Sequence, residues 1–333
     1  MNPIVNFNNK TVLVTGGAGF IGSNIVFYIQ ENFPKSHIVV FDCFRNSLSP
    51  INGNLQSLGH YKNLIGFQGD VICGNINCKK DLDLLSDYKF DYIFHQAAIS
   101  DTRALNQELI MQTNVNSFYN LLTIAKKDSA AMIYASSAAT YGSLKSPQVE
   151  GKEAPENPYA YSKYAMDQIA YRKIHNEINI PIVGLRYFNV YGKNEFYKGK
   201  TSSMVIQLGH QILSNKAPKL FINSNRIYRD FINIEDVVQA NINACSPKES
   251  GVYNIGTGKP RSFQNIADIL QEELGTELGT EYFPNPYEGY QMHTQADINL
   301  SKDFLGFKPK ISLEIGIKKY ISEIKRLHLE PID

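Results

Sequence analysis

Two residues in the middle of the chain have the types and spacing for proton chemistry on a hydroxyl group. Tyr159 and Lys163 form a YxxxK pair, and residues four apart lie on one face of a helix. A free tyrosine has a pKa near ~10, and a neighbouring ammonium lowers that pKa and makes the phenol a usable base. The same spacing also describes a half-buried tyrosine beside a surface lysine, because YxxxK alone is common.

Ser137 strengthens the chemical interpretation of this pair. It lies in the string YASSAATYG (134–142), directly after a short apolar run. A serine there falls at the carboxyl edge of a parallel sheet, where open α/β folds bind their ligands. Its hydroxyl can hydrogen-bond the reacting hydroxyl of a substrate. We therefore predict that Ser137 and Tyr159 belong to one site.

A glycine-rich turn near the N-terminus has the spacing of a dinucleotide-binding loop. Gly16, Gly19 and Gly22 follow an apolar run and open a helical pattern. Missing Cβ atoms allow a tight turn and a close approach of the backbone to a pyrophosphate, while the helix N-terminus supplies N–H donors. The strand before the turn and the helix after it make this pattern more specific than a lone glycine string.

The choice between NAD and NADP is open at the level of sequence. Asp42, at the end of the second apolar run, can bind ribose hydroxyls and repels a 2′-phosphate, which favours NAD. Arg45 can pair with that phosphate and so favours NADP. Arg45 is equally compatible with a solvated charge in a loop.

The elements that must position these residues alternate between strands and helices. Helical patterns such as Ile21, Ile25 and Ile29 separate the apolar runs. The alternation predicts right-handed βαβ units and an α/β, doubly wound Rossmann-type parallel sheet over residues 1–187, with a returning segment near 232–258. The apolar runs typical of its buried strands are Thr11–Thr15, Ile38–Phe41, Tyr92–His95, Met132–Ala135 and Ile182–Arg186.

Residues 188–333 are predicted to form mainly a smaller α/β substrate-binding cap. Tyr191–Ser203 is rich in Gly, Lys and Tyr and is typical of a functional loop. We expect a strand over Tyr253–Gly258 and helices over Met204–Leu213, Ile234–Ala244 and Ile311–Leu327.

Composition excludes several classes of function. The 33 Lys and Arg residues nearly balance the 32 Asp and Glu residues, so the chain offers no basic field for nucleic acid or an anionic membrane. We find no signal peptide and no run of apolar residues long enough to span a membrane. The four cysteines form no CxxC pair and have no histidine cluster beside them, so we expect free thiols, no metal and a cytoplasmic protein.

The glycine loop, Ser137 and the Tyr159–Lys163 pair together resemble the extended short-chain dehydrogenase/reductase superfamily. Within it, the chain is most similar to the ADP-L-glycero-D-manno-heptose 6-epimerase family, from Thr11 to about Lys319. The segments that carry this resemblance are YASSAATYG (134–142), RYFNVYG with the following KG (186–199), PKLF (218–221), RDF (229–231), YNIGTG (253–258), SFQ (262–264) and YQMHTQAD (290–297).

The resemblance implies an activity and its catalytic residues. The expected reaction inverts C6 of the heptose in ADP-D-glycero-D-manno-heptose, by transient oxidation and re-reduction with tightly bound NADP, for the inner core of lipopolysaccharide. Tyr159 corresponds to the catalytic tyrosine, Lys163 to its activating lysine, Ser137 to the hydroxyl-binding serine and Lys198 to a second acid/base. Without the resemblance, Lys198 is an ordinary solvated lysine. The family also implies a homo-oligomer, a pentamer.

Further ligand contacts follow only from the resemblance. The expected cofactor residues are Gly16, Gly19, Phe20, Ile21, Gly22, Asp42, Arg45, Asn75, Ile76, Gln96, Ala97, Ala98, Ser100, Asn114, Tyr159, Lys163, Val190 and Lys198. The expected substrate residues are Ser137, Asn189, Ser203, Gln207, Phe221, Ser224, Arg229 and Tyr290. Arg229 is also compatible with an ion pair to Asp230 or Glu235.

The chain departs from the family pattern in the substrate loop and near the adenosine phosphate. Arg45–Phe67 is longer than expected, Gln207 stands where a histidine is expected, and Asn194 where an arginine is expected. The main alternative is a UDP-hexose 4-epimerase or another sugar-nucleotide-modifying member of the superfamily. A 4,6-dehydratase needs an acidic residue beside Ser137, where this chain has alanines. A non-catalytic NADP-binding protein typically lacks the Tyr or the Lys.

Overall fold

A seven-stranded parallel sheet forms the centre of the computed structural model, which describes residues 5–45, 58–176, 179–286 and 290–331. The strand order is β11-β6-β5-β4-β1-β2-β3, and every neighbouring pair is parallel. The doubly wound Rossmann-type fold is therefore confirmed. The strands are β1 (Thr11–Thr15), β2 (His37–Asp42), β3 (Asp70–Cys73), β4 (Tyr92–His95), β5 (Ala131–Ser137), β6 (Ile182–Tyr187) and β11 (Gly251–Ile255).

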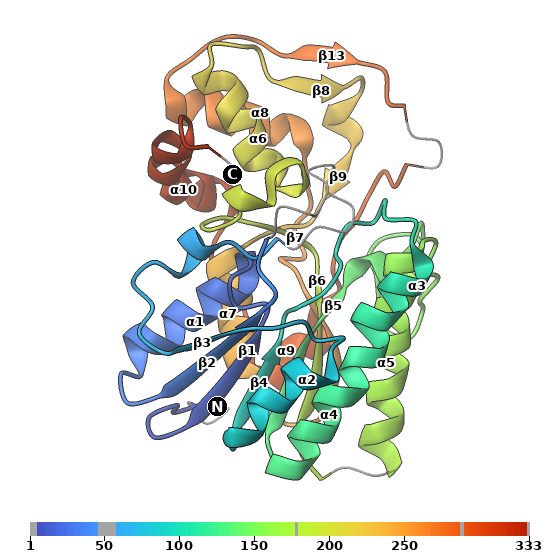
Figure 1. The fold of residues 1–333 in the computed structure, drawn as a ribbon. Helices are drawn as coiled ribbons and strands as arrows, with labels where there is room; N and C mark the ends of the chain where they lie inside the picture. The colour runs from blue at the N-terminus through green and yellow to red at the C-terminus, as the bar shows by residue number, and fades with distance from the viewer. Residues whose placement is uncertain (1–4, 46–57, 177–178, 287–289, 332–333) are drawn as a thin grey trace.

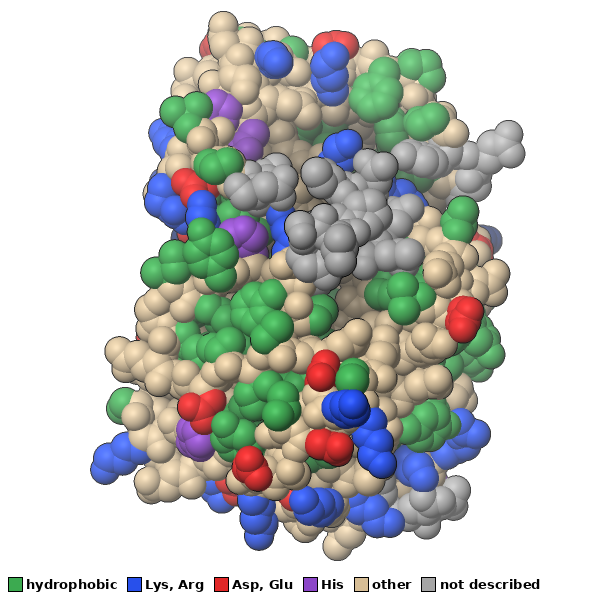
Figure 2. All heavy atoms as spheres, in the orientation of Figure 1, with side chains coloured by type: hydrophobic (Ala, Val, Ile, Leu, Met, Phe, Trp, Pro, Cys, Tyr) green, Lys and Arg blue, Asp and Glu red, His purple; other side chains and the backbone are tan. Residues whose placement is uncertain are grey.

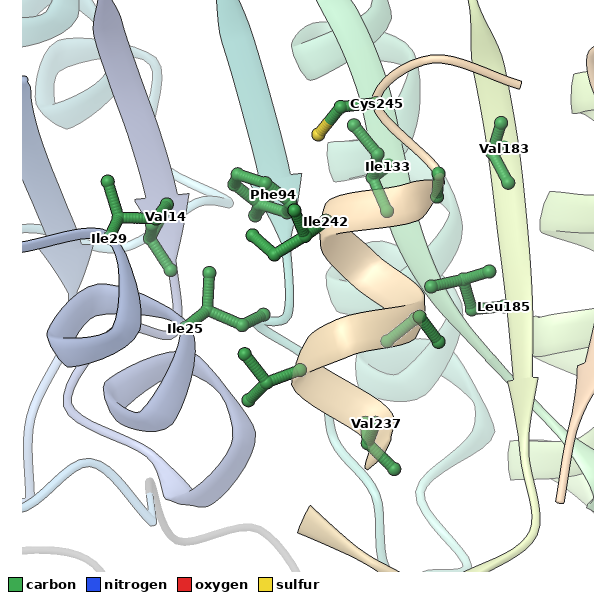
Figure 3. Packing of buried hydrophobic residues seen from close by; sticks show 14 of the residues in the cluster. Val14, Ile25, Ile29, Phe94, Ile133, Val183, Leu185, Val237, Ile242 and Cys245 are labelled. Atoms are coloured by element: carbon green, nitrogen blue, oxygen red, sulfur yellow. The ribbon is translucent and has the colours of Figure 1, made fainter. Parts of the chain in front are cut away.

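Helices cover both faces of this sheet (Figure 1). On one face, α1 (Phe20–Asn32) and α7 (Ile234–Asn243) bury their apolar sides against β1, β5 and β6. Figure 3 shows this contact, where Ile25 and Ile29 of α1 lie near Val14. On the other face lie α4 (Ser117–Asp128) and α5 (Pro158–Asn176). Short helical segments connect these layers: η1 (Tyr61–Leu64), α2 (Lys79–Asp83), η2 (Leu84–Asp87), α3 (Gln107–Ile110), η3 (Met111–Asn116) and η4 (Ala138–Tyr141).

A second apolar cluster lies above the carboxyl edge of the sheet. Its helices are α6 (Met204–Leu213), α8 (Phe263–Leu274) and α10 (Leu313–Leu327), which pack on one another (Figure 1). Short elements surround them: β7 (Asn189–Tyr191) with β10 (Phe231–Asn233), β8 (Lys219–Phe221) with β13 (Glu281–Phe283), β9 (Tyr228–Arg229) with β12 (Arg261–Ser262), and the turns η5 (Phe196–Thr201) and η6 (Ser224–Arg226).

The last part of the chain returns to the sheet layer. Leu305 at the end of α9 (Asn299–Leu305) and the nearby Phe307 belong to the same apolar cluster as β1 and α1. The second half therefore contributes more to the sheet layer than the segment near 232–258 that the sequence indicates.

Several strands differ from the sequence prediction, and β11 and β3 are the most informative of them. β11 ends at Ile255, three residues before the predicted end, because the amides of Thr257 and Gly258 turn to bind the Asp230 carboxylate at 2.7 and 2.8 Å. β3 was not predicted at all. It is an edge strand whose side chains are mostly exposed, so it lacks the apolar run that marks the buried strands.

Charges on the surface are mixed in sign. On the face seen in Figure 2, Lys and Arg side chains are scattered among Asp and Glu. None of the helices in the described part of the chain is long and apolar enough to cross a membrane. The described residues also contain no group of three His, Cys, Asp or Glu side chains arranged to hold a metal ion.

Candidate active site

A cavity of about 510 Å³ opens at the carboxyl edge of the sheet, on the side where helices α6, α8 and α10 lie. Its wall combines the ends of β1, β2, β4 and β5 with residues that follow β6 and with the η5 turn. Lys163, Ser137 and most of the predicted cofactor residues line it: Gly16, Gly19, Phe20, Ile21, Gly22, Asp42, Asn75, Ile76, Gln96, Ala97, Ala98, Ser100, Tyr159, Val190 and Lys198. The sheet edge thus brings together positions that span most of the chain.

The glycine loop has the close geometry that a dinucleotide requires. Gly16 has a φ of +70°, and a Cβ there would lie 2.7 Å from the backbone nitrogen of Ala97. A Cβ on Gly22 would lie 2.2 Å from the carbonyl oxygen of Gly16. Gly19 caps the N-terminus of α1 in an extended conformation. Side chains at these positions would fill the cradle, so the loop fits a pyrophosphate held by backbone amides.

Asp42 ends β2 as a buried carboxylate at the edge of the cavity. Its oxygens accept hydrogen bonds from the amides of Ala18 and Phe44 at 3.0 and 2.9 Å. Burial raises the pKa of Asp42, and these amides act in the opposite direction. Gly59 packs so closely that a Cβ there would lie 2.2 Å from the carboxylate. Sequence reasoning missed Gly59, because it belongs to the long Arg45–Phe67 segment.

Tyr159 and Lys163 lie on α5 beside the end of β5, as the i, i+4 spacing predicts. The ammonium of Lys163 donates to the carbonyl of Ala135 at 2.8 Å, and burial lowers its pKa to about 8. Burial raises the pKa of Tyr159, while a hydrogen bond with Ser137 lowers it in part. The net shift of the Tyr159 pKa is therefore upward, and the group that lowers it is Ser137 and not Lys163, to which the sequence argument assigns this effect.

A buried ionic network lies behind this pair and was not predicted. Asp167, one turn after Lys163, accepts hydrogen bonds from Tyr134, Ser136 and Arg186, each at 2.9 Å. Arg186 and Asp167 are both fully buried. The charge of Asp167 raises the pKa of Lys163 against the larger effect of burial. Arg186 belongs to the RYFNVYG string, but the string alone does not identify its partner.

Lys198 reaches the cavity from the cap side. Its ammonium lies 5.3 Å from the centre of the Phe20 ring on α1. Burial lowers the pKa of Lys198, and the charge of Glu195 raises it. The residue is therefore not the solvated loop lysine that its sequence context alone indicates.

Most predicted substrate residues lie in the cap and outside the cavity lining. The guanidinium of Arg229 lies 5.0 Å from the ring centre of Tyr290 and 5.6 Å from that of Phe263. The Phe221 ring contacts Tyr290 edge to face at 5.6 Å. Ser224 is buried nearby, with its hydroxyl 3.4 Å from Gln264. Asn189 is exposed on β7.

The structure also bears on the alternative role of Arg229. Asp230 accepts its hydrogen bonds from Thr257, Gly258 and Ala296, and Glu235 pairs with Lys319. Among the described residues, Arg229 thus has no ion pair with either acidic neighbour.

Four predicted residues make contacts within the protein that the sequence does not indicate. The Asn114 side chain accepts a hydrogen bond from the Ile99 amide and donates to the Ile99 carbonyl and the Ser162 hydroxyl. The Arg45 guanidinium donates to the Tyr197 carbonyl. In the cap, Ser203 hydrogen-bonds Glu195 and Gln207 donates to the Ser202 carbonyl.

The long Arg45–Phe67 segment contacts the Lys198 loop through its described part. The rings of His60 and Tyr197 stack with centres 3.9 Å apart and planes within 2° of parallel. The Asn63 amide donates to the carbonyls of Ala18 and Asn194 at 3.1 and 3.3 Å. The segment in which this chain departs from the family pattern therefore contacts both the glycine loop and the loop that carries Lys198.

Comparisons with known proteins show the family of this chain. Residues 12–256 match the model of the NAD dependent epimerase/dehydratase family. The chain belongs to this family. It is 36% identical over 322 residues to the ADP-L-glycero-D-manno-heptose-6-epimerase of Brachyspira hyodysenteriae, covering 95% of this chain and 98% of the relative.

Solved structures of this epimerase/dehydratase family are similar along the whole chain. The Helicobacter pylori ADP-L-glycero-D-manno-heptose-6-epimerase is 48% identical with a TM-score of 0.87, covering 96% of this chain and 97% of that one. The Thermotoga maritima UDP-glucose 4-epimerase, solved with UDP-glucose, is 28% identical with a TM-score of 0.83, covering 96% and 100%. The resemblance seen in the sequence is confirmed, and the closer match is to the heptose enzyme of the two.

Proposed function

We propose that this chain inverts C6 of the heptose in ADP-D-glycero-D-manno-heptose and gives the L-glycero epimer. The observation that carries the proposal is the placement of two proton-transfer groups in one cavity. Tyr159 stands on α5 and Lys198 packs over Phe20 of α1, and these two helices cover opposite faces of the sheet. When the oxidised carbon is re-reduced on its other face, two such groups can remove the proton on one side and return it on the other. The high identity to heptose epimerases supports the same substrate.

The cofactor of this enzyme is a nicotinamide dinucleotide, as its epimerase family implies. When bound, it accepts a hydride from the substrate carbon and later returns it. The amides of the glycine loop would hold its pyrophosphate and Asp42 its ribose, because no side chain obstructs the loop. Since the hydride returns to the substrate carbon, the cycle leaves no net redox change.

The protein's own residues supply the proton steps. Ser137 holds the reacting oxygen beside Tyr159, and its hydrogen bond favours the ionised phenol. Lys163 stays fixed by the Ala135 carbonyl and supplies a positive charge. Lys198, with its pKa lowered by burial, can give or take a proton near neutral pH more readily than an exposed lysine.

NADP and the cap contacts form the finer part of the proposal. Arg45 would pair with the 2′-phosphate, so Arg45→Ala should weaken NADP binding more than NAD binding in a titration. Equal losses would remove Arg45 from the cofactor site. Residues 188–333 would form mainly the substrate cap, in which Phe221, Arg229 and Tyr290 contact the nucleotide.

The cellular role follows from the product. The epimer would supply the heptose of the lipopolysaccharide inner core, with the enzyme a homo-oligomer in the cytoplasm. Cys73, Cys78 and Cys245 are free thiols, which fits a reducing compartment.

The deciding experiment offers the protein two sugar nucleotides and follows each by NMR. We expect ADP-D-glycero-D-manno-heptose to be converted and UDP-galactose to remain unchanged. Turnover of UDP-galactose with inert ADP-heptose would favour a UDP-hexose 4-epimerase and leave the Tyr159 chemistry intact. Nucleotide released by denaturing the purified protein tests the cofactor separately, because an enzyme that returns its own hydride has no need to exchange it.

A further inference from the structure

We propose that Glu195 is a positioning residue that closes the Gly192–Ser203 loop and holds Lys198 in the cavity. This inference deepens the proposed function and rests on the acid/base role given there to Lys198. Glu195 does not line the cavity, so it acts through the lysine and not on the substrate.

The contacts of Glu195 tie the two ends of the loop together. One carboxylate oxygen accepts from the Gly192 amide at 3.0 Å and from the Ser203 hydroxyl at 2.8 Å. The other accepts from the Ser203 amide at 2.6 Å. The side chain is fully buried, and charge-assisted hydrogen bonds to buried donors are the strong ones. Ser203, which the resemblance predicts to contact substrate, also makes these contacts within the loop.

The backbone inside the loop depends on the same residue. The amide of Lys198 donates to the carbonyl of Glu195 at 3.0 Å, which begins the η5 turn. Gly199 then reverses the chain with a φ of +56°. Gly192 has a φ of +136°, and a Cβ there would lie 2.6 Å from Ile234. The spacing Gly-x-x-Glu-x-x-Lys-Gly is therefore the local sequence of a closed loop.

The charge of Glu195 also acts on the lysine. Burial lowers the pKa of Lys198, and Glu195 is the group that raises it. Burial likewise raises the pKa of Glu195. The charge of Lys198 and the hydrogen bonds from the Gly192 and Ser203 amides lower this pKa, but their effect is smaller than that of burial. Tyr320 of α10 is another titratable side chain that faces this carboxylate, and burial followed by the charge of Glu195 raises its pKa. The charge of Glu195 also raises the pKa of Tyr191 of β7, for which burial is the largest cause.

The test uses the purified full chain with its cofactor and the variants Glu195→Gln, Glu195→Asp and Glu195→Ala. Asp236→Asn is the matched control, because Asp236 is also buried and accepts from two backbone amides, those of Lys310 and Ile311, outside the cavity. The first readout is hydrogen exchange of the 192–203 amides by mass spectrometry. We expect exchange about tenfold faster or more in Glu195→Ala, as for the loss of a buried charged hydrogen-bond partner.

The second readout is the pH profile of ADP-heptose epimerisation. In Glu195→Gln the limb that belongs to Lys198 should move to lower pH by about one unit, because an opposite charge has been removed. Glu195→Asp keeps the charge and should restore the position of that limb. Asp236→Asn should change neither readout.

The outcomes separate this inference from the proposed function. If ADP-heptose is not a substrate, the exchange of the 192–203 amides still tests the loop. Unchanged exchange in a folded Glu195→Ala, or an unchanged pH profile in Glu195→Gln, would overturn the proposal. If Glu195→Ala does not fold, Glu195→Gln and Glu195→Asp carry both measurements.

Discussion

A buried lysine, Lys163, and a half-buried lysine, Lys198, reach the same cavity from supports of different kinds. Lys163 stands on the long helix α5, with Asp167 one turn later on the same helix. Lys198 stands on the short η5 turn, with Glu195 three residues before it. In both regions burial lowers the pKa of the lysine and a buried carboxylate raises it. The same arrangement, a lysine near a buried carboxylate, thus occurs once on a long helix and once on a loop.

The two carboxylates differ in what holds them. Asp167 is held by side chains from β5 and β6, namely Tyr134, Ser136 and Arg186. Glu195 is held within its own loop. The core of the sheet domain therefore fixes the position of Asp167 and Lys163. Glu195 and Lys198 are fixed within their own loop, so their position in the cavity depends on how that loop packs on the rest of the protein. Under the proposed function, one proton-transfer group would thus belong to the helix α5 and the other to the Lys198 loop.

The largest expected effect is the loss of either proton-transfer group. Tyr159→Phe and Lys198→Met should each lower the epimerisation rate by ~10²–10⁴-fold, the range for a general acid or base. An aldehyde analogue of the oxidised intermediate tests the division of labour, because each single variant should fail on one face and the double variant should show no disproportionation. Full activity in Lys198→Met would refute the two-base mechanism and leave Tyr159 as the sole acid/base.

A stability measurement distinguishes the two carboxylates. Asp167→Asn removes one of the two carboxylates that pair with the fully buried Arg186, the other being Glu153, and should lower the free energy of unfolding by about 3 kcal/mol, the lower end of the range for breaking a buried ion pair. Glu195→Gln should cost less, because a lysine can lose its proton when its partner is removed and an arginine cannot. Urea denaturation of both variants measures the difference. A larger loss for Glu195→Gln would contradict the view that the helix site is anchored by the core.

The same contrast explains what the sequence could predict. β1, β4 and α6 have the predicted limits, because buried parallel strands and an amphipathic helix leave clear apolar patterns. The glycine loop and the Tyr159–Lys163 pair were also identified, since their spacing is local. Asp167 and Arg186 escaped prediction because they are nineteen residues apart in the chain and meet only in the folded core.

The loop was harder to predict than the helix. Ser203 and Gln207 were expected to contact substrate from the resemblance, yet their polar atoms bind Glu195 and the Ser202 carbonyl. A family pattern gives positions and not hydrogen-bond partners. The docking of His60 on Tyr197 involves the segment in which this chain departs from its family, so no pattern could indicate it.

A pH titration of stability tests whether Lys163 has the lowered pKa. Its pKa is about 8 in the folded chain against 10.5 for an unperturbed lysine, so between these pH values the unfolded chain binds more protons. Stability due to this group is therefore lowest below pH 8 and rises towards pH 10.5. The unfolding free energy of the wild type, minus that of Lys163→Met, should increase across this window. A flat difference would mean that Lys163 titrates normally. Lys198→Met should give the same sign.

The smallest expected effect concerns the docking of the loop. His60→Ala removes the ring that stacks on Tyr197, one residue before Lys198. An aromatic pair contributes about 0.5–1.5 kcal/mol, which corresponds to roughly a two- to tenfold fall in kcat if the stack positions the lysine. His60→Phe keeps the stacked ring and should restore most of the rate. His37→Ala, a half-exposed histidine at the start of β2, is the matched control.

This variant separates docking from closure of the loop. Glu195 stays in place in His60→Ala, so the 192–203 amides should remain protected from hydrogen exchange while kcat falls. The amides of α5 should be unaffected, because the Asp167 network does not involve His60. Since the described part of the long segment also binds Ala18 of the dinucleotide loop through Asn63, the affinity for the cofactor gives a third readout. A fall in cofactor affinity with unchanged kcat would mean that His60 serves the dinucleotide loop and not Lys198, and the contrast between the two lysines would then rest on Glu195 alone.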